Sequence, residues 1–342
     1  PCSRQRDLEG GRGIGGRDVF GGNGRVLRED LAERVELLGG VARFVQRSVV
    51  VVRRRDRQIP TLVIGAVCQP EVRAAVEHVE VDRGPSGEER VQFGRRMGAA
   101  DLISGGRLQL GISRGSPEQV IDGWRHFGHQ PAEGEDQADM ARRHAETFLN
   151  LLEGRGFAEP APRPMFPNPP GLLRLEPHSD GLRDRIWWGA ASDATAIWAA
   201  QKGMNLQSST LKADETGEPF HVQQARQIRK FRAAWDEAGH DRKPRVSVSR
   251  SIFALMTDED RMYFGRGGKE ADQVGQIDNM RAIFGKGYAD EPDRLIRQLK
   301  EDEAIAEADT MLLTVPNMLG VAYNVHVLDS ILTHVAPEMG WR

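Results

Sequence analysis

The sequence predicts an α/β protein in which short strands alternate with helices around a parallel sheet. From about residue 93 onward, short apolar segments of strand length alternate with amphipathic segments of helix length. Glycines such as Gly106, Gly154 and Gly203 follow the helical segments, as they do at helix ends. Five β/α units are readable between residues 93 and 342. A closed (β/α)8 barrel needs eight units, so residues 1–95 would have to supply three, and an open doubly wound sheet is the alternative.

The predicted elements follow from the local pattern. We expect strands at 107–113, 184–190, 204–209, 245–256 and 310–316, and helices at 93–106, 140–154, 193–203, 221–239, 291–307 and 324–335. Residues 160–170 predict a loop because proline disrupts helices and inner strands. The helix at 221–239 places one apolar face against the core, formed by Val222, Ala225, Ile228, Phe231, Ala234 and Trp235. Residues 265–276 are polar and glycine-rich, which suits either a mobile active-site loop or a plain surface loop.

The first part of the chain has a different character. Residues 1–95 are rich in Arg and Gly and contain neither Trp nor Tyr. Within them we expect an amphipathic helix at 31–45 and buried strands at 48–52 and 61–67. The chain therefore divides into an atypical region, 1–95, and a barrel domain, 96–342.

Composition narrows the class of protein. The formal net charge of -3 over 342 residues argues against nucleic acid as the main partner. Two cysteines make no disulfide framework, and we see neither a membrane-spanning run nor an apolar leader, so we expect a cytoplasmic protein without membrane contact. No Walker A, HExxH or CxxC motif is present, and His126 and His129 are interpreted as lid or core residues, so we expect no metal site.

Two strand ends carry the residues that suggest a ligand. The strand at 107–113 ends in Ser113, Arg114 and Gly115, and the active face of a β/α barrel lies at the carboxyl ends of its strands. The planar fork of Arg114 suits a phosphate, and Gly115 permits close approach of the backbone. The strand at 184–190 is followed by the helix at 193–203. Ser192 occupies the N-cap of that helix and Thr195 lies in its first turn, where a hydroxyl and free N–H groups can bind an anion. Each feature alone also fits a structural role as helix cap or ion pair, but together they predict a phosphate-bearing ligand.

These segments carry a family resemblance. Residues 99–120, AADLISGGRLQLGISRGSPEQV, with RHFGH at 125–129 and WWGAASDATAIWAAQKGMN at 187–205, resemble the luciferase-like monooxygenase family. The resemblance implies a (β/α)8 TIM barrel that binds FMN or, in a subgroup, a deazaflavin. It assigns the flavin phosphate to Arg114, Ser192 and Thr195 and places Ser113 at the isoalloxazine ring. Ala191 stands where some members carry a glutamate of the phosphate loop.

The implied activity is that of a flavin-dependent monooxygenase. By this resemblance, a separate reductase supplies reduced FMN, which reacts with O2 to a flavin C4a-peroxide that oxidises a small organic substrate, and the protein is a homodimer. The alternatives are a deazaflavin-dependent hydride-transfer oxidoreductase, a non-catalytic flavin-binding protein, or a phosphosugar-binding barrel. The family's front motifs are absent from residues 1–95, where His78 has no matching context, so the catalytic residues stay unknown. We hypothesise that this region is a frameshifted or otherwise altered reading of the first three β/α units.

Overall fold

The computed structural model describes residues 49–53, 62–65, 87–113, 131–163, 166–168, 170–213, 216–265, 271–277 and 280–341. All of them belong to one compact unit, Gln46–Arg342. The predicted helix at 31–45 lies outside the described residues.

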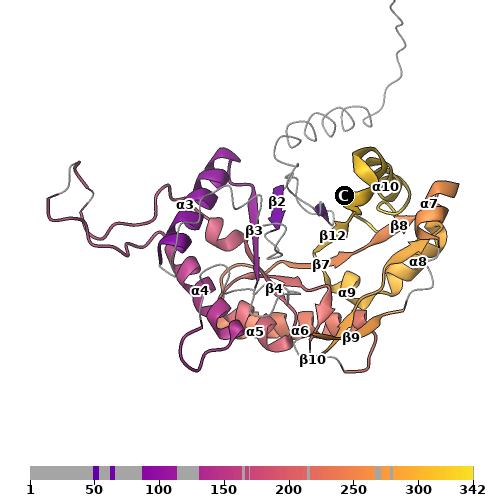
Figure 1. Ribbon diagram of the computed structural model, residues 1–342, viewed down its shortest axis with the longest axis horizontal. Coiled ribbons are helices and arrows are strands. Elements are labelled where there is room, and N and C mark those ends of the chain that lie inside the picture. Colours follow the sequence, from indigo (N-terminus) through magenta and orange to yellow (C-terminus); the bar gives the residue numbers. More distant parts are fainter. Residues whose placement is uncertain are drawn as a thin grey trace, which may run out of the picture. The chain divides into compact units, whose positions relative to one another are not determined.

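A curved parallel sheet organises this unit (Figure 1). Its strands, in spatial order, are β1 (Val49–Arg53), β12 (Thr310–Thr314), β7 (Val246–Arg250), β5 (Asn205–Ser208), β4 (Ile186–Ala190), β3 (Leu108–Ser113) and β2 (Leu62–Gly65). Neighbouring strands are parallel except that β1 pairs antiparallel with β12. The expected strands near 48–52 and 61–67 are confirmed as the two edge strands. In the described residues the sheet has seven strands, and its edge strands β1 and β2 are not paired with each other. The predicted barrel has eight strands and is closed, so these residues show only part of that architecture.

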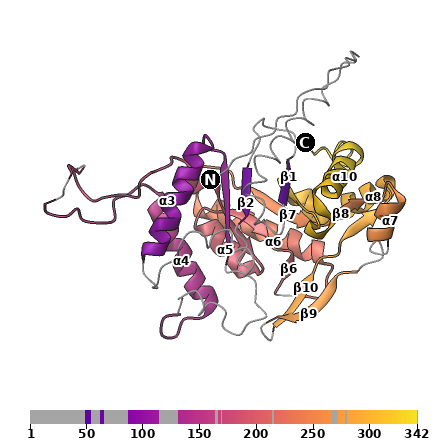
Figure 2. The same ribbon diagram turned by 45° about the horizontal axis from the view of Figure 1, so that its top comes forward.

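Helices cover one face of this sheet. They are α3 (Gly87–Ile103), α4 (Gln137–Leu152), α5 (Asp193–Gln201), α6 (Phe220–Ala238) and α10 (Gly320–His334), with the short 3-10 turns η3 (Leu182–Arg185) and η5 (Asn317–Leu319). Figure 2 shows α5 and α6 side by side beneath the strands. Most of the predicted face of α6 is buried, from Ala225 to Trp235. None of the described helices is both long enough and apolar enough to cross a membrane.

The two faces of the sheet differ in chemistry because side chains alternate along a strand. Leu108, Leu110, Trp188, Leu206 and Val248 point into the apolar core beneath the helices. The opposite face is polar or glycine-rich, and it carries Gln109, Gly111, Ser113, Trp187, Gly189, Gln207, Ser247 and Ser249. We call this second face the concave face. It corresponds to the interior of a β/α barrel.

Two predicted elements are interrupted. The strand expected at 245–256 is wrong as one strand, because the chain leaves the main sheet after β7 and forms β8 (Ile252–Ala254), which pairs with β11 (Tyr288–Asp290). The helix expected at 291–307 is two helices, α8 (Pro292–Glu301) and α9 (Glu303–Glu307). Asp302 separates them in an extended conformation, and its carboxylate accepts from the Ile305 N–H and caps α9.

A small second sheet was not predicted. It has the order β6 (Leu211–Lys212), β10 (Met280–Phe284) and β9 (Gln273–Ile277). The helix α7 (Asp258–Phe264) precedes β9 in the chain. The predicted loop at 265–276 therefore already contains the start of β9, and its residues 266–270 lie outside the described part.

Candidate functional site

The carboxyl end of the concave face brings two of the sequence motifs together. Ser113 is the last residue of β3 and lies beside Gly189 of β4 in the sheet register. A Cβ built on Gly189 would come within 3.0 Å of the Ser113 Cβ. On the same face, a Cβ built on Gly111 meets no atom of the described residues within 4 Å. Among the described residues, small side chains thus leave space over this part of β3 and β4.

The first turn of α5 follows directly from β4. Ser192 is the N-cap, and its hydroxyl oxygen accepts from the Thr195 N–H at 3.4 Å. The Thr195 hydroxyl lies 3.1 Å from both the Ser192 hydroxyl and the Ser192 carbonyl oxygen. The helix dipole and free N–H groups favour an anion at such an end. Ser192 and Thr195 therefore lie as predicted, at a helix N-terminus beside the open end of the concave face.

The other predicted positions have different outcomes. Ala191 lies in the turn between β4 and α5, and its carbonyl oxygen accepts from the Ala213 N–H at 3.0 Å. Arg114 and Gly115 lie outside the described residues, so their assignment to a phosphate stays a prediction. His126 and His129 also lie outside the described part of the chain.

An ion cluster at the start of α5 was missed by the sequence reasoning. Asp193 is the first residue of the helix, and its carboxylate binds the ammonium groups of Lys212 at 2.7 Å and Lys230 at 2.6 Å. Burial acts to raise the pKa of Asp193, but the two lysines outweigh it and hold that pKa below its usual value. No local motif marks this cluster, because Lys212 and Lys230 are 19 and 37 residues away in the chain.

The amino end of the concave face is closed by polar side chains. The Gln109 amide oxygen accepts from Trp187 Nε1 at 2.9 Å and from the Arg245 guanidinium at 2.8 Å. That guanidinium also lies 4.6 Å from the centre of the Trp187 ring. Trp188 points to the opposite face and packs edge-on against Trp198. One of the two adjacent tryptophans therefore lines the concave face, as alternation predicts.

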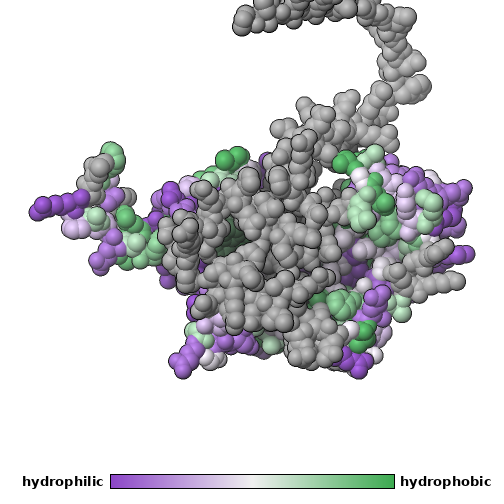
Figure 3. All heavy atoms as spheres, viewed as in Figure 1, coloured by the Kyte–Doolittle hydropathy of each residue, from purple (hydrophilic) through white to green (hydrophobic). Residues whose placement is uncertain are grey.

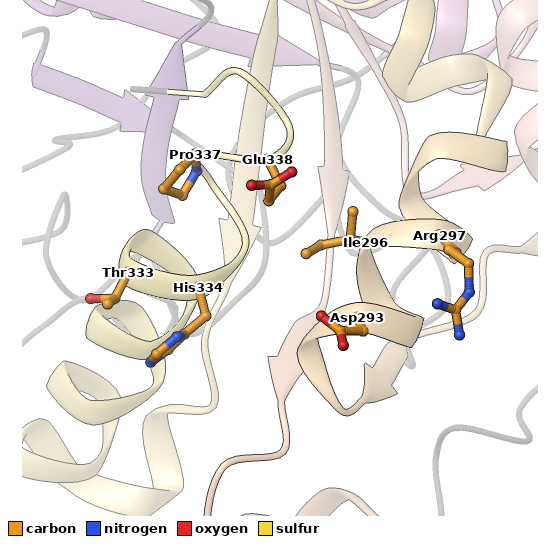
Figure 4. A pocket seen from close by; sticks show the side chains of 7 residues that line it. All are labelled: Asp293, Ile296, Arg297, Thr333, His334, Pro337 and Glu338. Atoms are coloured by element: carbon orange, nitrogen blue, oxygen red, sulfur yellow. The ribbon is translucent and has the colours of Figure 1, made fainter.

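A pocket of about 430 Å³ lies elsewhere, between α8 and the C-terminal end of α10 (Figure 4). Its lining is mixed in charge and includes Asp293, Arg297, His334 and Glu338. It is separate from the ends of β3 and β4. We call the ends of β3 and β4, together with the first turn of α5, the cradle. The cradle, and not this pocket, holds the described residues that the sequence predicts, namely Ser113, Ala191, Ser192 and Thr195.

The comparisons with known proteins agree with this architecture. A family model described as luciferase-like monooxygenase matches residues 91–263. No curated protein sequence matches the chain significantly.

Two solved monooxygenase structures are similar in fold at low identity, and a reductase structure is also matched. Monooxygenase RslO1 from Streptomyces bottropensis is 15% identical with a TM-score of 0.50, over 72% of this chain and 74% of that one. The oxygenating constituent of 3,6-diketocamphane monooxygenase from Pseudomonas putida, in complex with FMN, is 16% identical with a TM-score of 0.50, over 72% and 75%. The coenzyme F420-dependent tetrahydromethanopterin reductase from Methanopyrus kandleri is 14% identical with a TM-score of 0.45, over 75% and 81%.

Proposed function

The chain belongs to the luciferase-like monooxygenase family, and from this premise we propose that it is a flavin-dependent monooxygenase that uses reduced FMN and O2 to oxidise a small organic substrate. The observation that carries the proposal is the cradle at the ends of β3 and β4. There the open surface around Ser113 and Gly189 adjoins the hydroxyl-bearing N-terminus of α5.

The residues present fit FMN in two respects. The space over Gly111 and the absence of a side chain at Gly189 would admit a planar ring beside Ser113. The Ser192 and Thr195 hydroxyls and the first N–H groups of α5 are the donor set that a phosphate needs. Arg114, which directly follows Ser113, would add a bidentate contact to that phosphate.

In this proposal the protein supplies binding, orientation and shelter. When bound, reduced FMN supplies the electrons for the reaction with O2. Ser192, Thr195 and Arg114 would hold the phosphate of FMN at the start of α5. At the amino end of the concave face, a cluster of polar side chains limits the access of water to the site. It consists of Gln109, Trp187 and Arg245.

The proposal also includes the complete architecture and the partners. The curvature of the seven-stranded sheet supports the (β/α)8 barrel that the family resemblance implies. A separate reductase supplies the reduced FMN, and two copies of the chain form a homodimer.

A fluorescence titration with FMN and with riboflavin tests the function. We expect FMN to bind more tightly than riboflavin, and Arg114→Ala to reduce the difference by about tenfold, since a charge-assisted contact to the phosphate is lost. Equal binding of FMN and riboflavin would contradict the phosphate site. A parallel titration with the deazaflavin F420 decides between oxygenation and hydride transfer. Flavin binding without substrate oxidation in the presence of a reductase would indicate a non-catalytic flavin-binding protein.

A further inference from the structure

The N-terminus of α5 carries a negative charge close to the proposed phosphate position. Asp193 is the first residue of the helix, directly after the N-cap Ser192. A carboxylate in the first turn stabilises a helix, because it interacts with the positive end of the dipole. The same charge opposes a second anion at that end, because like charges repel. Asp193 therefore weakens the binding of a dianionic phosphate at this N-terminus unless its charge is neutralised.

Two lysines from separate elements neutralise that carboxylate. Lys212 of β6 contacts one carboxylate oxygen, and Lys230 of α6 contacts the other. The Lys212 side chain is only 1% exposed and that of Lys230 is 47% exposed. Burying an ammonium group is costly unless it is paired, so the fold places Lys212 there at a cost that Asp193 offsets.

Lys212 also connects the small second sheet to the turn before α5. It pairs with Ile283 of β10 in the sheet register. The next residue, Ala213, donates its N–H to the Ala191 carbonyl oxygen, in the turn where the sequence predicts a phosphate. The ammonium group and the neighbouring backbone thus reach the same short segment, Ala191–Ser192–Asp193.

From this arrangement we infer that Lys212 and Lys230 are positioning residues for the cofactor phosphate: they neutralise Asp193, so that the N-terminus of α5 accepts a dianion. The inference rests on the proposed function. It assigns to Lys212 an electrostatic effect on phosphate binding in addition to its structural contact. It also makes the link between β6 and α5 a determinant of the preference for FMN over riboflavin.

The test measures dissociation constants of FMN and riboflavin by flavin fluorescence for the full chain. The quantity of interest is their ratio, because both ligands share the ring and only FMN carries the phosphate. We expect Lys212→Met to lower the preference for FMN roughly tenfold, since Lys230, on the surface, is then the one of these two lysines left to offset the Asp193 charge near the phosphate. Adding Asp193→Asn to that variant is expected to restore most of the preference, because the repulsive charge is gone.

A control and a milder variant accompany the test. Lys202→Gln removes an exposed lysine at the opposite end of α5, where it pairs with Glu146, and is expected to leave the ratio unchanged. Lys230→Gln removes the charge of an exposed side chain that pairs with Asp193, and is expected to lower the ratio about threefold. A thermal melt of each variant shows whether it is folded. If Lys212→Met does not fold, Lys230→Gln decides, and an unchanged ratio in that variant overturns the inference.

The outcomes separate this inference from the proposed function. If wild type binds FMN no better than riboflavin, the phosphate site is wrong and the inference falls with it. If wild type prefers FMN but folded Lys212→Met keeps the full preference, the function stands and the inference is overturned. If Lys212→Met loses the preference and Asp193→Asn does not restore it, Lys212 acts only as a structural support, which also overturns the inference.

Discussion

The Ser113 Cβ lies 3.0 Å from the position that a Cβ on Gly189 would occupy. Any side chain at residue 189 would therefore push against Ser113 and rise into the open end of the concave face. We expect Gly189→Val to weaken binding of FMN and riboflavin alike, by more than about tenfold, because the two ligands share the ring that this surface would hold. Fluorescence titration with both ligands checks this, and a loss confined to FMN would place the phosphate, not the ring, beside Gly189.

The N-cap of α5 can be tested against the N-cap of another helix. Ser192→Ala removes the cap of α5, and Asp136→Ala removes the equivalent cap of α4, where the carboxylate accepts from the Asp139 N–H at 2.7 Å. Each is expected to lower the free energy of unfolding by about 1 kcal/mol. Only Ser192→Ala is expected to reduce the preference for FMN over riboflavin. Chemical denaturation and flavin titration measure the two effects, and an equal change in flavin preference for both variants would refute a specific role for Ser192.

A buried ion pair joins β7 to the junction between α8 and α9. Arg250 contacts the Asp302 carboxylate at 2.8 and 3.1 Å, and the Tyr288 hydroxyl donates to it at 2.7 Å. Both charged side chains are almost fully buried. We expect Asp302→Asn to lower the free energy of unfolding by about 3–5 kcal/mol, because it leaves the Arg250 charge without a counter-charge. Glu303→Gln is the matched control, because Glu303 is the next residue in the chain and lies on the surface. We expect it to lower the free energy of unfolding by about 0–1 kcal/mol, and urea denaturation measures both variants.

The same carboxylate gives the stability a pH dependence. Burial acts to raise the pKa of Asp302, but Arg250 outweighs it and holds that pKa below its usual value. A carboxyl whose pKa is lower in the folded state stabilises the fold above its unfolded pKa of about 3.9, and that stability is lost as the pH falls through the folded value. Acid titration by circular dichroism should therefore show a shallower loss of stability below about pH 5 in Asp302→Asn than in wild type. Equal slopes would mean that other carboxyls dominate acid unfolding.

Much of the α/β pattern could be predicted from the sequence, because most elements are bounded by local signals. Gly106 and Gly154 close α3 and α4 with positive φ angles, and β3 and β4 are apolar on the helix-covered face. The breaks at Ser251 and Asp302 could not be predicted in this way. They depend on pairing between β8 and β11 and on the contact between Arg250 and Asp302, which are non-local.

In the candidate site, too, the residues with local signals could be predicted and those placed by non-local contacts could not. Ser113, Ser192 and Thr195 follow directly from strand ends and a helix start, so their places could be read from the sequence. The lysines that hold Asp193 come from β6 and α6, and β6 has only two residues, which is too short for a periodic signal. Val321, Val325 and Leu332 of α10 remain exposed, although the sequence pattern indicates only that a helix is present there. Figure 3 shows hydrophobic surface in the region that α10 occupies in Figure 1.

The packing of α3 against the segment before η3 yields a prediction that runs against helix propensity. Ala is a better helix former than Gly by about 1 kcal/mol, so Gly→Ala within a helix normally stabilises it. A Cβ on Gly98, however, would lie 2.3 Å from the Pro177 carbonyl oxygen, which belongs to the backbone. Gly98→Ala must then separate the helix from that segment, and we expect it to lower the free energy of unfolding by about 2–3 kcal/mol.

Gly94, one turn earlier in α3, provides the matched comparison. A Cβ there would lie 2.8 Å from a terminal methyl of Leu175, a side chain that can rotate away. We expect Gly94→Ala to change the free energy of unfolding by less than about 1 kcal/mol, because the gain in helix propensity offsets the rearrangement of Leu175. Urea denaturation of both variants measures the difference. If Gly98→Ala is as stable as Gly94→Ala, the close contact between α3 and the Pro177 backbone is contradicted.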